Sequence, residues 1–385
     1  MTPAARAAAA IGVLDRWLAG VPAEQALTNW GRASRYAGSG DRHAVRDIVY
    51  DAIRCRRSFA QRGGEETGRG LVLGGIRERG EDPALSFTGA GHAPAPLAVG
   101  EAVDPGPATG LAALDCPDWL EPLLQDSLGA DFAPVMAALR HRAPLFLRVN
   151  AARIDRAGAI ARLAAEGIIA LPHALADTAL LVQQGARKIH ASQCFAEGFV
   201  ELQDAASQAV VQALPVTPGL RVLDFCAGGG GKALALAARG AAVTAHDADA
   251  GRMRDLAPRA ARAGAAIALV PPGQVPAPHP LVLADAPCSG SGSWRRAPEA
   301  KWALTPARLA ELVVLQARIL DLAAGLVTPG GTLAYATCSM IGAENGAQAR
   351  AFLARTPGWT LRREHRFTPL DGGDGFYLAQ LRRVL

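Results

Sequence analysis

Two cysteines stand directly after two strand-like segments of the sequence. Cys288 follows the run LVLADA within LVLADAPCSGSG, and Cys338 follows the run GTLAYAT within GTLAYATCSM. Asp285 lies three residues before Cys288. If the two runs are neighbouring strands of an open sheet, their ends meet in one crevice, which is where such sheets bind ligands. A lone cysteine is usually an inert core residue, but two cysteines and an acid that converge there indicate a reaction centre.

A thiolate and an acid in one crevice could activate a ring that is a poor nucleophile. Carbon 5 of cytosine is such a centre. A thiolate that adds to carbon 6 turns the ring into an enamine, whose carbon 5 can attack a sulfonium methyl group. An acid near ring nitrogen 3 stabilises the adduct, and a base then removes the proton on carbon 5 before the thiolate leaves. One cysteine would be the nucleophile, and a second group would assist release.

A glycine-rich turn lies upstream, in VLDFCAGGGGKALAL, between a strand-like run and the start of a helix. Glycines allow the backbone to approach a ligand closely, and the free amides at a helix start face that ligand. Asp247 ends the next strand-like run, 23 residues after Asp224. An acid at this place can accept hydrogen bonds from the ribose hydroxyls of an adenosine cofactor.

The turn by itself leaves two kinds of cofactor open. A phosphate-binding loop is excluded, because Cys226 and Ala233 occupy the places where it needs Gly and Ser or Thr. A dinucleotide-binding turn fits loosely, through Gly228, Gly230 and Ala233. Nicotinamide and methionine-derived cofactors are therefore comparable at this point. A tight turn without any ligand is disfavoured, because four successive glycines are costly to order.

The elements that position these residues alternate regularly from Pro218 onward. Strands are expected at residues 221–225, 241–246, 266–270, 281–286 and 331–337, and helices at 232–239, 250–263, 306–325 and 343–354. Two further strands, GWTLRR and GFYLAQLRR, are close enough in sequence to form a hairpin. This alternation predicts an α/β fold, a Rossmann-like, mostly parallel sheet with helices on both faces and an antiparallel hairpin at its C-terminal end.

Two different regions precede this domain. Residues 1 to about 60 are predicted to be helical, with an apolar face on RHAVRDIVYDAIRCRRSF and arginines opposite. This basic face, formed by Arg42, Arg46, Arg54, Arg56 and Arg57, either contacts phosphates or is an ordinary solvated helix face. Residues 63–110 are rich in Gly and Pro and indicate a loose, linking region with room for one short helix. A strand at 144–150, a helix at 156–166, two short β-like runs and a final helix follow. The predicted parts are therefore a helical region with its linker (1–115), a small α+β segment (116–215) and the α/β domain (216–385).

Composition narrows the class of protein. Half of the 385 residues are hydrophobic, which is typical of a globular chain. A net charge of +5 is compatible with a nucleic-acid partner. No apolar run is long enough to span a membrane, and the first residues lack a secretory signal. None of the six cysteines forms a CxxC pair, so a zinc site is disfavoured. Without a secretory signal, a disulfide framework is disfavoured as well. We expect a cytoplasmic protein, a monomer, with reduced thiols.

Taken together, the motifs resemble the Sun/RsmB family of RNA 5-methylcytosine methyltransferases over roughly residues 140–385. The matching segments are LRVN at 147–150, LQDAASQ at 202–208, CAGGGGK at 226–232, DADAGRM at 247–253, DAPCSGSG at 285–292, RRAPEAKW at 295–302, YATCS at 335–339, EN at 344–345 and DGFY at 374–377. The first 60 residues resemble, more loosely, the helical domain related to the antitermination factor NusB. Residues 118–215 would be the family's small RNA-binding segment.

The resemblance implies a role for each matching residue. Cys338 would be the nucleophile, Cys288 would assist product release, and Asp285 would contact the cofactor or the target base. Lys301 would lie in the active-site loop. The implied cofactor is S-adenosylmethionine, and the residues expected to bind it are Cys226, Ala227, Gly228, Gly229, Gly230, Gly231, Lys232, Asp247, Arg252 and Asp285. Only three of the 40 basic residues are lysines, and two of them fall inside these motifs, which strengthens the assignment. The implied substrate is RNA, and ribosomal RNA of the small subunit in particular.

Two departures keep alternatives open. Pro272 stands about where the family has an acid near the adenine, which would weaken cofactor binding or shift adenine recognition to the backbone. The turn reads CAGGGG where many members have CAAPGG, a change that preserves backbone access. The same chemistry on transfer RNA is one alternative. An RNA-binding assembly factor that has lost catalysis is another, and a nicotinamide-dependent oxidoreductase would leave the two cysteines unexplained.

Overall fold

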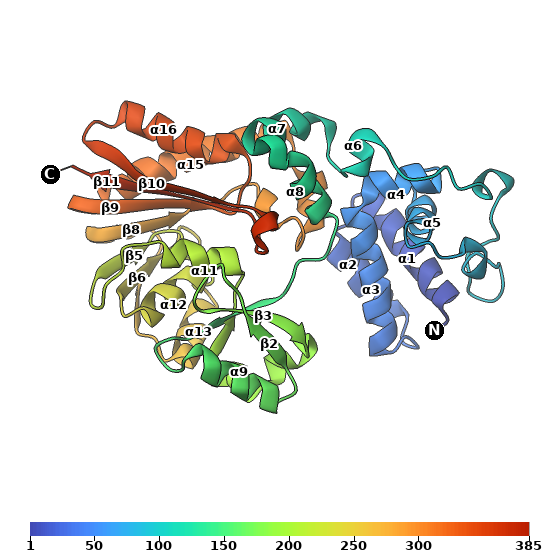
Figure 1. Ribbon diagram of the computed structural model, residues 1–385, viewed down its shortest axis with the longest axis horizontal. Coiled ribbons are helices and arrows are strands. Elements are labelled where there is room, and N and C mark those ends of the chain that lie inside the picture. The colour runs from blue at the N-terminus through green and yellow to red at the C-terminus, as the bar shows by residue number, and fades with distance from the viewer. Residues whose placement is uncertain (385) are drawn as a thin grey trace. The chain divides into compact units, whose positions relative to one another are not determined.

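The computed structural model describes residues 1–384, and the chain divides into two compact units (Figure 1). The first unit consists of Met1–Gln125, Gly129–Arg142 and Trp294–Ala303. The second consists of Asp126–Leu128, Ala143–Ser293 and the chain from Leu304 onward. Most of residues 116–142 thus group with the helical region. The ten residues Trp294–Ala303, which the sequence placed in the α/β domain, do so as well. The three-part division expected from the sequence stays a prediction.

The first unit is helical. Its helices are α1 (Pro3–Leu18), α2 (Ala23–Ala33), α3 (Ser39–Arg54), α4 (Arg56–Gly63), α5 (Gly68–Glu78), α6 (Gly110–Ala113), the first part of α7 (Glu121–Leu128), α8 (Phe132–Leu139) and α14 (Pro298–Ala303). The predicted apolar face of α3 is confirmed, because Val45, Val49 and Ile53 are completely buried in one core with α1, α2 and α5. A helix with apolar residues at this spacing is stabilised mainly by such packing.

Several arginines of the predicted basic face on α3 and α4 are paired within the first unit. Arg46 pairs with Glu24, and Arg56 pairs with Glu66. Arg57 pairs with Asp118 at 2.6 Å. Arg54 is buried and donates to the carbonyl oxygen of Arg295 at 3.0 Å. Much of the charge that would meet phosphates is therefore already neutralised within this unit.

The glycines at 63–75 pack helices closely and do not form the loose linker that was predicted. Helix α5 is 11 residues long. A Cβ atom on Gly74 would lie 2.0 Å from the carbonyl oxygen of Phe59, and one on Gly70 would lie 2.1 Å from that of Glu65. Only residues without a side chain allow the backbones of α4 and α5 to approach this closely. The short helix that was predicted within residues 63–110 is α5, but a loose segment at these glycines was wrong, because glycine marks a tight helix contact as readily as a flexible segment.

The second unit contains two sheets. A four-stranded antiparallel sheet has the order β2-β3-β1-β4, and a seven-stranded sheet has the order β10-β11-β9-β8-β5-β6-β7. The elements of the smaller part are β1 (Phe146–Val149), α9 (Arg156–Ala165), β2 (Ile169–Pro172), β3 (Ala179–Gln184), α10 (Gln193–Ala196), β4 (Val200–Leu202) and α11 (Ala205–Gln212). Those of the larger part are β5 (Arg221–Asp224), α12 (Gly231–Ala238), β6 (Ala242–His246), α13 (Leu256–Ala263), β7 (Ile267–Val270), β8 (His279–Asp285), α15 (Pro306–Gly325), β9 (Val327–Thr337), α16 (Gly346–Arg355), β10 (Trp359–Phe367) and β11 (Phe376–Arg383).

The larger sheet confirms the predicted fold class. Strands β9, β8, β5, β6 and β7 run parallel, while β11 is antiparallel to both β9 and β10. Helices α11, α12 and α13 cover one face, and α15 and α16 cover the other (Figure 1). Along β8, Leu281 and Leu283 pack on the first face, whereas Val282 and Ala284 pack on the second. A strand buried on both faces needs such a continuous apolar run.

One predicted helix is shorter than expected. The sequence predicts a helix over 250–263, but α13 begins at Leu256. The carboxylates of Asp247 and Asp249 accept backbone N–H groups two residues ahead, from Asp249 at 3.0 Å and Gly251 at 2.8 Å. These local hydrogen bonds compete with helix formation and hold the segment in turns.

In the part of the chain that the structure describes, no helix is long and apolar enough to cross a membrane.

Candidate active site

The structure brings the two motif cysteines together. Strands β8 and β9 are parallel neighbours, with Asp285 opposite Ala336 in the register. Their carboxyl ends therefore lie side by side, and the Sγ atoms of Cys288 and Cys338 are 3.3 Å apart. Both thiols are half-buried and unoxidised.

The two thiols differ in acidity. The hydrogen bond from Cys288 lowers the pKa of Cys338 against the effect of burial, and the nearby Lys232 charge lowers it further. The same hydrogen bond, together with burial, raises the pKa of Cys288 well above its usual value. Cys338 is therefore the sulfur that ionises first, with Cys288 as its donor. Since the thiolate is the reactive form of cysteine, this order singles out Cys338 as the stronger candidate nucleophile.

An ion pair lies beside the cysteines. Lys232, buried on α12, places its Nζ atom 2.6 Å from Oδ2 of Asp285 at the end of β8. Burial opposes the positive charge of Lys232, but the Asp285 carboxylate outweighs it, so the pKa of Lys232 is raised. The Lys232 Nζ atom also lies 4.9 Å from the centre of the Phe376 ring. The lysine of the glycine turn thus holds the acid that precedes Cys288.

The glycine turn requires glycine at two positions. Gly228 and Gly230 have positive φ angles of 49° and 82°. A Cβ atom on Gly230 would lie 2.6 Å from Cγ of Leu256. Gly230 also precedes the first residue of α12, so the turn opens directly into a helix N-terminus. The neighbouring carbonyl groups are held from outside the turn: Arg259 donates to Gly229, and Arg148 donates to Gly231 at 2.6 Å.

Asp247 is joined to this turn. Its Oδ2 atom accepts the N–H of Gly228 at 3.0 Å and lies 3.1 Å from Nη1 of Arg252. The Ala227 N–H donates to the carbonyl oxygen of His246 at 2.9 Å, which ties the turn to β6. A carboxylate can accept about four hydrogen bonds, so Asp247 has capacity left for a ribose hydroxyl.

These residues fit an adenosyl sulfonium cofactor. The turn opens into the N-terminus of α12, whose backbone N–H groups can face a ligand, and an acceptor carboxylate stands at its edge on Asp247. Asp285 supplies a second carboxylate, whose negative charge would favour a positively charged cofactor. Burial raises the pKa of a third, Asp224, to about 7, and the charge of Asp285 adds to this effect. Among the expected cofactor residues, Cys226 keeps a half-buried thiol whose pKa is raised by burial.

Lys301 lies in the first unit, together with the rest of the RRAPEAKW motif. It is buried on α14, and its Nζ atom donates to the carbonyl oxygen of Arg54 at 3.2 Å. Burial lowers the pKa of Lys301 to about 8, although the nearby Asp115 carboxylate opposes this. The adjacent Trp302 donates to the Ile53 carbonyl oxygen at 2.7 Å. These contacts hold α14 against α3, and the active-site role of Lys301 stays a prediction.

The EN pair contains a residue whose importance the sequence did not reveal. Glu344 is completely buried, and its carboxylate accepts hydrogen bonds from Ser289 and Ser339, the residues directly after the two cysteines. Asn345 donates to the carbonyl oxygen of Ser339 at 2.8 Å. The EN dipeptide was among the segments that resemble the family, but a two-residue match does not show that its side chains bond to the loops after both cysteines.

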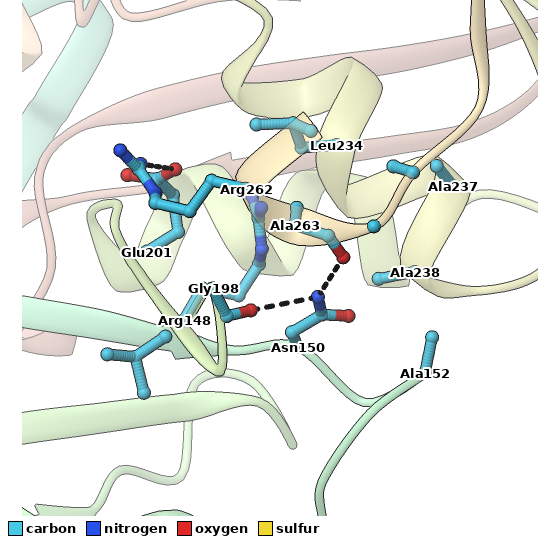
Figure 2. A pocket seen from close by; sticks show the side chains of 13 residues that line it. Arg148, Asn150, Ala152, Gly198, Glu201, Leu234, Ala237, Ala238, Arg262 and Ala263 are labelled. Atoms are coloured by element: carbon cyan, nitrogen blue, oxygen red, sulfur yellow. Dashed lines mark hydrogen bonds and ion pairs between the residues drawn. The ribbon is translucent and has the colours of Figure 1, made fainter. Parts of the chain in front are cut away.

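The upstream LRVN segment also acquires a structural role (Figure 2). A cavity of about 40 Å³ lies between the smaller sheet and helices α12 and α13. Around it, Glu201 pairs with Arg262 at 2.7 Å, and Asn150 donates to the carbonyl oxygen of Ala263 at 2.9 Å (Figure 2). Arg148 also donates to the side-chain oxygen of Gln203 at 2.5 Å. None of the residues expected to bind the cofactor lines it, and the volume suits one or a few waters. These contacts attach the smaller sheet to α12 and α13, next to the glycine turn.

The departure at Pro272 is a loop feature. Strand β7 ends at Val270, and Pro271 accepts a hydrogen bond from the N–H of Gln274 at 3.2 Å. The two prolines thus form an exposed turn where the family resemblance leads one to expect an acid.

Two family models match consecutive parts of the chain. The model described as 16S rRNA methyltransferase RsmB/F matches residues 211–382, and the one described as a ferredoxin-like domain of RsmF/B-like methyltransferases matches residues 116–188. Proteins named ribosomal RNA small subunit methyltransferase B from Salmonella arizonae and Citrobacter koseri are 36% identical over 282 residues, or 69% of this chain and 66% of theirs. The aligned region thus spans about two thirds of the relatives' own length.

Solved structures agree on the fold. The crystal structure of PH0851 gives a TM-score of 0.75 at 23% identity and covers 100% of this chain and 99% of its own. A methyltransferase homolog from Pyrococcus horikoshii gives 0.62 at 23% identity, covering 71% and 97%. NSun6 from the same organism gives 0.62 at 17% identity, covering 70% and 98%. Both family models, the curated relatives and the geometry around Cys288 and Cys338 agree, and the chain belongs to the RsmB/F family of methyltransferases.

Proposed function

We propose that this protein transfers a methyl group from S-adenosylmethionine to carbon 5 of a cytosine in RNA, through a covalent adduct with Cys338. The observation that carries the proposal is the 3.3 Å separation of the Cys288 and Cys338 sulfurs at adjacent strand ends. Ribosomal RNA of the small subunit is the proposed substrate, because the relatives' names refer to it. The family supports the cofactor, which supplies the methyl group as a sulfonium.

The first step is addition of the Cys338 thiolate to carbon 6 of the cytosine. The new sulfur–carbon bond moves an electron pair toward carbon 5 and ring nitrogen 3. Because an anion has added, the ring carries negative charge until ring nitrogen 3 takes up a proton from solvent. Asp285, held by Lys232, would then accept a hydrogen bond from that N–H group or from the amino group of the base. A charged, preorganised acceptor of this kind keeps the proton on ring nitrogen 3 without having to reorganise.

The last step is release. After methyl transfer, carbon 5 loses its proton to a base, and the bond between carbon 6 and the sulfur of Cys338 breaks. The departing sulfur takes the electron pair and becomes a thiolate. Cys288, whose raised pKa keeps it a neutral thiol, can donate a hydrogen bond to that thiolate and so stabilise the leaving group. This assigns the two sulfurs opposite tasks, nucleophile and donor.

Two other functions remain to be distinguished. The same reaction on transfer RNA would use the same residues. A noncatalytic RNA-binding factor is motivated by Pro272, but the sulfur pair and the Lys232–Asp285 pair argue against it.

The test is incubation of the purified protein with S-adenosylmethionine and either small-subunit ribosomal RNA or transfer RNA, followed by mapping of 5-methylcytosine. Mapping in RNA from a deletion strain would identify the site. Methylation of ribosomal RNA alone supports the proposal, and methylation of transfer RNA alone supports the first alternative. Cofactor binding without methylation of either RNA supports the noncatalytic alternative.

A further inference from the structure

Glu344 is a buried carboxylate without a positive partner. It ends the short 3-10 helix Gly342–Glu344 and has no exposed surface. Within residues 1–384, no arginine, lysine or histidine pairs with it. A buried charge of this kind is expensive unless hydrogen bonds satisfy it. Here Oε1 accepts from the Ser289 N–H at 2.7 Å and from Gln316 Nε2 at 3.0 Å, and Oε2 accepts from the hydroxyls of Ser289 and Ser339, both at 2.5 Å.

The donors come from the two loops that carry the cysteines. Ser289 directly follows Cys288, and Ser339 directly follows Cys338. Gln316, on α15, also donates from Nε2 to the carbonyl oxygen of Pro287 at 2.9 Å, on the other side of Cys288. One carboxylate is therefore bonded to both loops, one residue away from each sulfur.

The backbone around Glu344 is fixed as well. Tyr335 Oη, on β9, donates to the Glu344 carbonyl oxygen at 2.6 Å. The next residue, Asn345, accepts from Thr337 Oγ1 at 2.6 Å and donates to the Ser339 carbonyl oxygen at 2.8 Å. The carboxylate is thus attached to the same strand whose end carries Cys338, and it has little freedom to follow a displaced loop.

We propose that Glu344 is a positioning residue that holds the Cys288 and Cys338 loops together and so sets the short distance between the two sulfurs. Its part in methyl transfer rests on the proposed function. The geometric claim does not, because the sulfur pair can be probed without RNA or cofactor.

Substitution by glutamine separates geometry from charge. Glutamine keeps the shape of Glu344, but its amide nitrogen is itself a donor and would face hydrogen-bond donors. The groups that act on Cys338 are Cys288, Asp285, Lys232 and Glu344. The Glu344 charge raises the pKa of Cys338, so loss of the charge alone would lower it. Separation of the sulfurs would instead raise it, because the hydrogen bond from Cys288 would be lost.

The experiment is alkylation of Cys338 by iodoacetamide as a function of pH, followed on the Cys338 peptide by mass spectrometry. In Glu344→Gln we expect the midpoint to move to higher pH by about one unit, which is roughly a tenfold lower rate at neutral pH. The matched control is Glu311→Gln, an exposed glutamate on α15, which should leave the profile unchanged. A midpoint that is unchanged or moves to lower pH in Glu344→Gln overturns the proposal.

A second variant covers the case in which Glu344→Gln does not fold. The double variant Ser289→Ala, Ser339→Ala leaves the carboxylate and Gln316 in place but removes both hydroxyl donors. It should shift the Cys338 profile in the same direction by a smaller amount. Where both proteins fold, adding Glu344→Gln to the serine double variant should have less effect than it has alone, because interacting groups are not additive. A wild-type profile in the serine double variant overturns the proposal.

Methyl transfer distinguishes this proposal from the proposed function. If the protein methylates RNA, Glu344→Gln should lower kcat roughly tenfold or more and leave KM for S-adenosylmethionine unchanged. If the wild-type protein methylates no RNA, the proposed function fails while the alkylation result still decides the role of Glu344.

Discussion

The sulfurs of Cys288 and Cys338 lie 3.3 Å apart although 50 residues separate them in the chain. Either sulfur can donate in this contact, and the surroundings favour the arrangement in which Cys288 donates and Cys338 ionises. An asymmetric pair can divide a reaction between bond formation and release. The first three predictions follow from this relationship.

Covalent trapping should separate the two cysteines. Cys338→Ala should abolish methylation and form no protein–RNA adduct. Cys288→Ala should accumulate an adduct that survives denaturing gel electrophoresis and requires S-adenosylmethionine, because the bond forms but release is slow. Cys194→Ala, at a buried cysteine on α10, serves as the control and should behave like the wild type. Adduct from Cys338→Ala but not from Cys288→Ala would reverse the two roles, and full activity in both would remove the thiolate mechanism.

Oxidation should join the same two sulfurs. Diamide takes two electrons and two protons from a pair of thiols and leaves a disulfide. Because the sulfurs need to close only from 3.3 Å to about 2 Å, we expect a Cys288–Cys338 disulfide, loss of methyl transfer, and recovery with dithiothreitol. Peptide mapping identifies the bond. Its absence in the wild-type protein under conditions that oxidise a dithiol reference peptide would contradict the short separation.

The acidity of Cys338 should depend on Cys288. In the wild type the donor lowers the pKa of Cys338, so its thiolate persists to lower pH than an ordinary cysteine allows. Cys288→Ala removes the donor and should move the alkylation midpoint of Cys338 upward by about one unit. The alkylation rate at neutral pH should then fall roughly tenfold. A midpoint that stays in place would show that the Lys232 charge, rather than the thiol, dominates.

Asp247 should contribute to cofactor affinity. Asp247→Ala removes the acceptor for ribose and also the partner of the Gly228 N–H. Loss of a charged hydrogen bond is worth ~1.5–3 kcal/mol, or roughly tenfold or more in Kd for S-adenosylmethionine. Titration calorimetry measures it, with the exposed Asp255→Ala as control. Unchanged affinity in a folded Asp247→Ala protein would place the ribose elsewhere.

A side chain at Gly230 should disturb both the turn and its stability. Alanine at a φ of 82° is strained by roughly 1–2 kcal/mol. The contact of its Cβ atom with Leu256 at 2.6 Å adds an overpacking cost of about 1–3 kcal/mol. Urea unfolding of Gly230→Ala should show this loss, and S-adenosylmethionine binding should weaken. Gly325→Ala, where a Cβ atom would meet nothing within 4 Å, should be nearly neutral. Equal stability of the two variants would mean that the turn relaxes freely.

Local patterns in the sequence determined the elements and their order. The run that predicted a helix over 306–325 corresponds to α15, which begins after Thr305, where the side chain accepts the Arg308 N–H at 3.1 Å. The strand before each cysteine was equally visible. Helices and strands can be predicted in this way because their repeating patterns involve residues that are close in sequence. The residues that cap a helix likewise act within one turn of it. The glycine turn could be located for the same reason, since the strand and the helix that flank it are local.

Contacts between distant segments were decided only by the tertiary structure. The glycine-rich sequence around Gly74 predicted a linker, but Gly74 lies in a close contact between helices. Lys301 belongs to a segment grouped with the helical unit, which nothing within residues 294–303 indicated. Glu344 reaches Ser289 across 55 residues. Such pairings depend on how sheets stack and loops close, and they have no sequence period. The sequence therefore identified the reactive residue types and the strand ends that carry them, while the distances that allow one thiol to act on the other came from long-range packing.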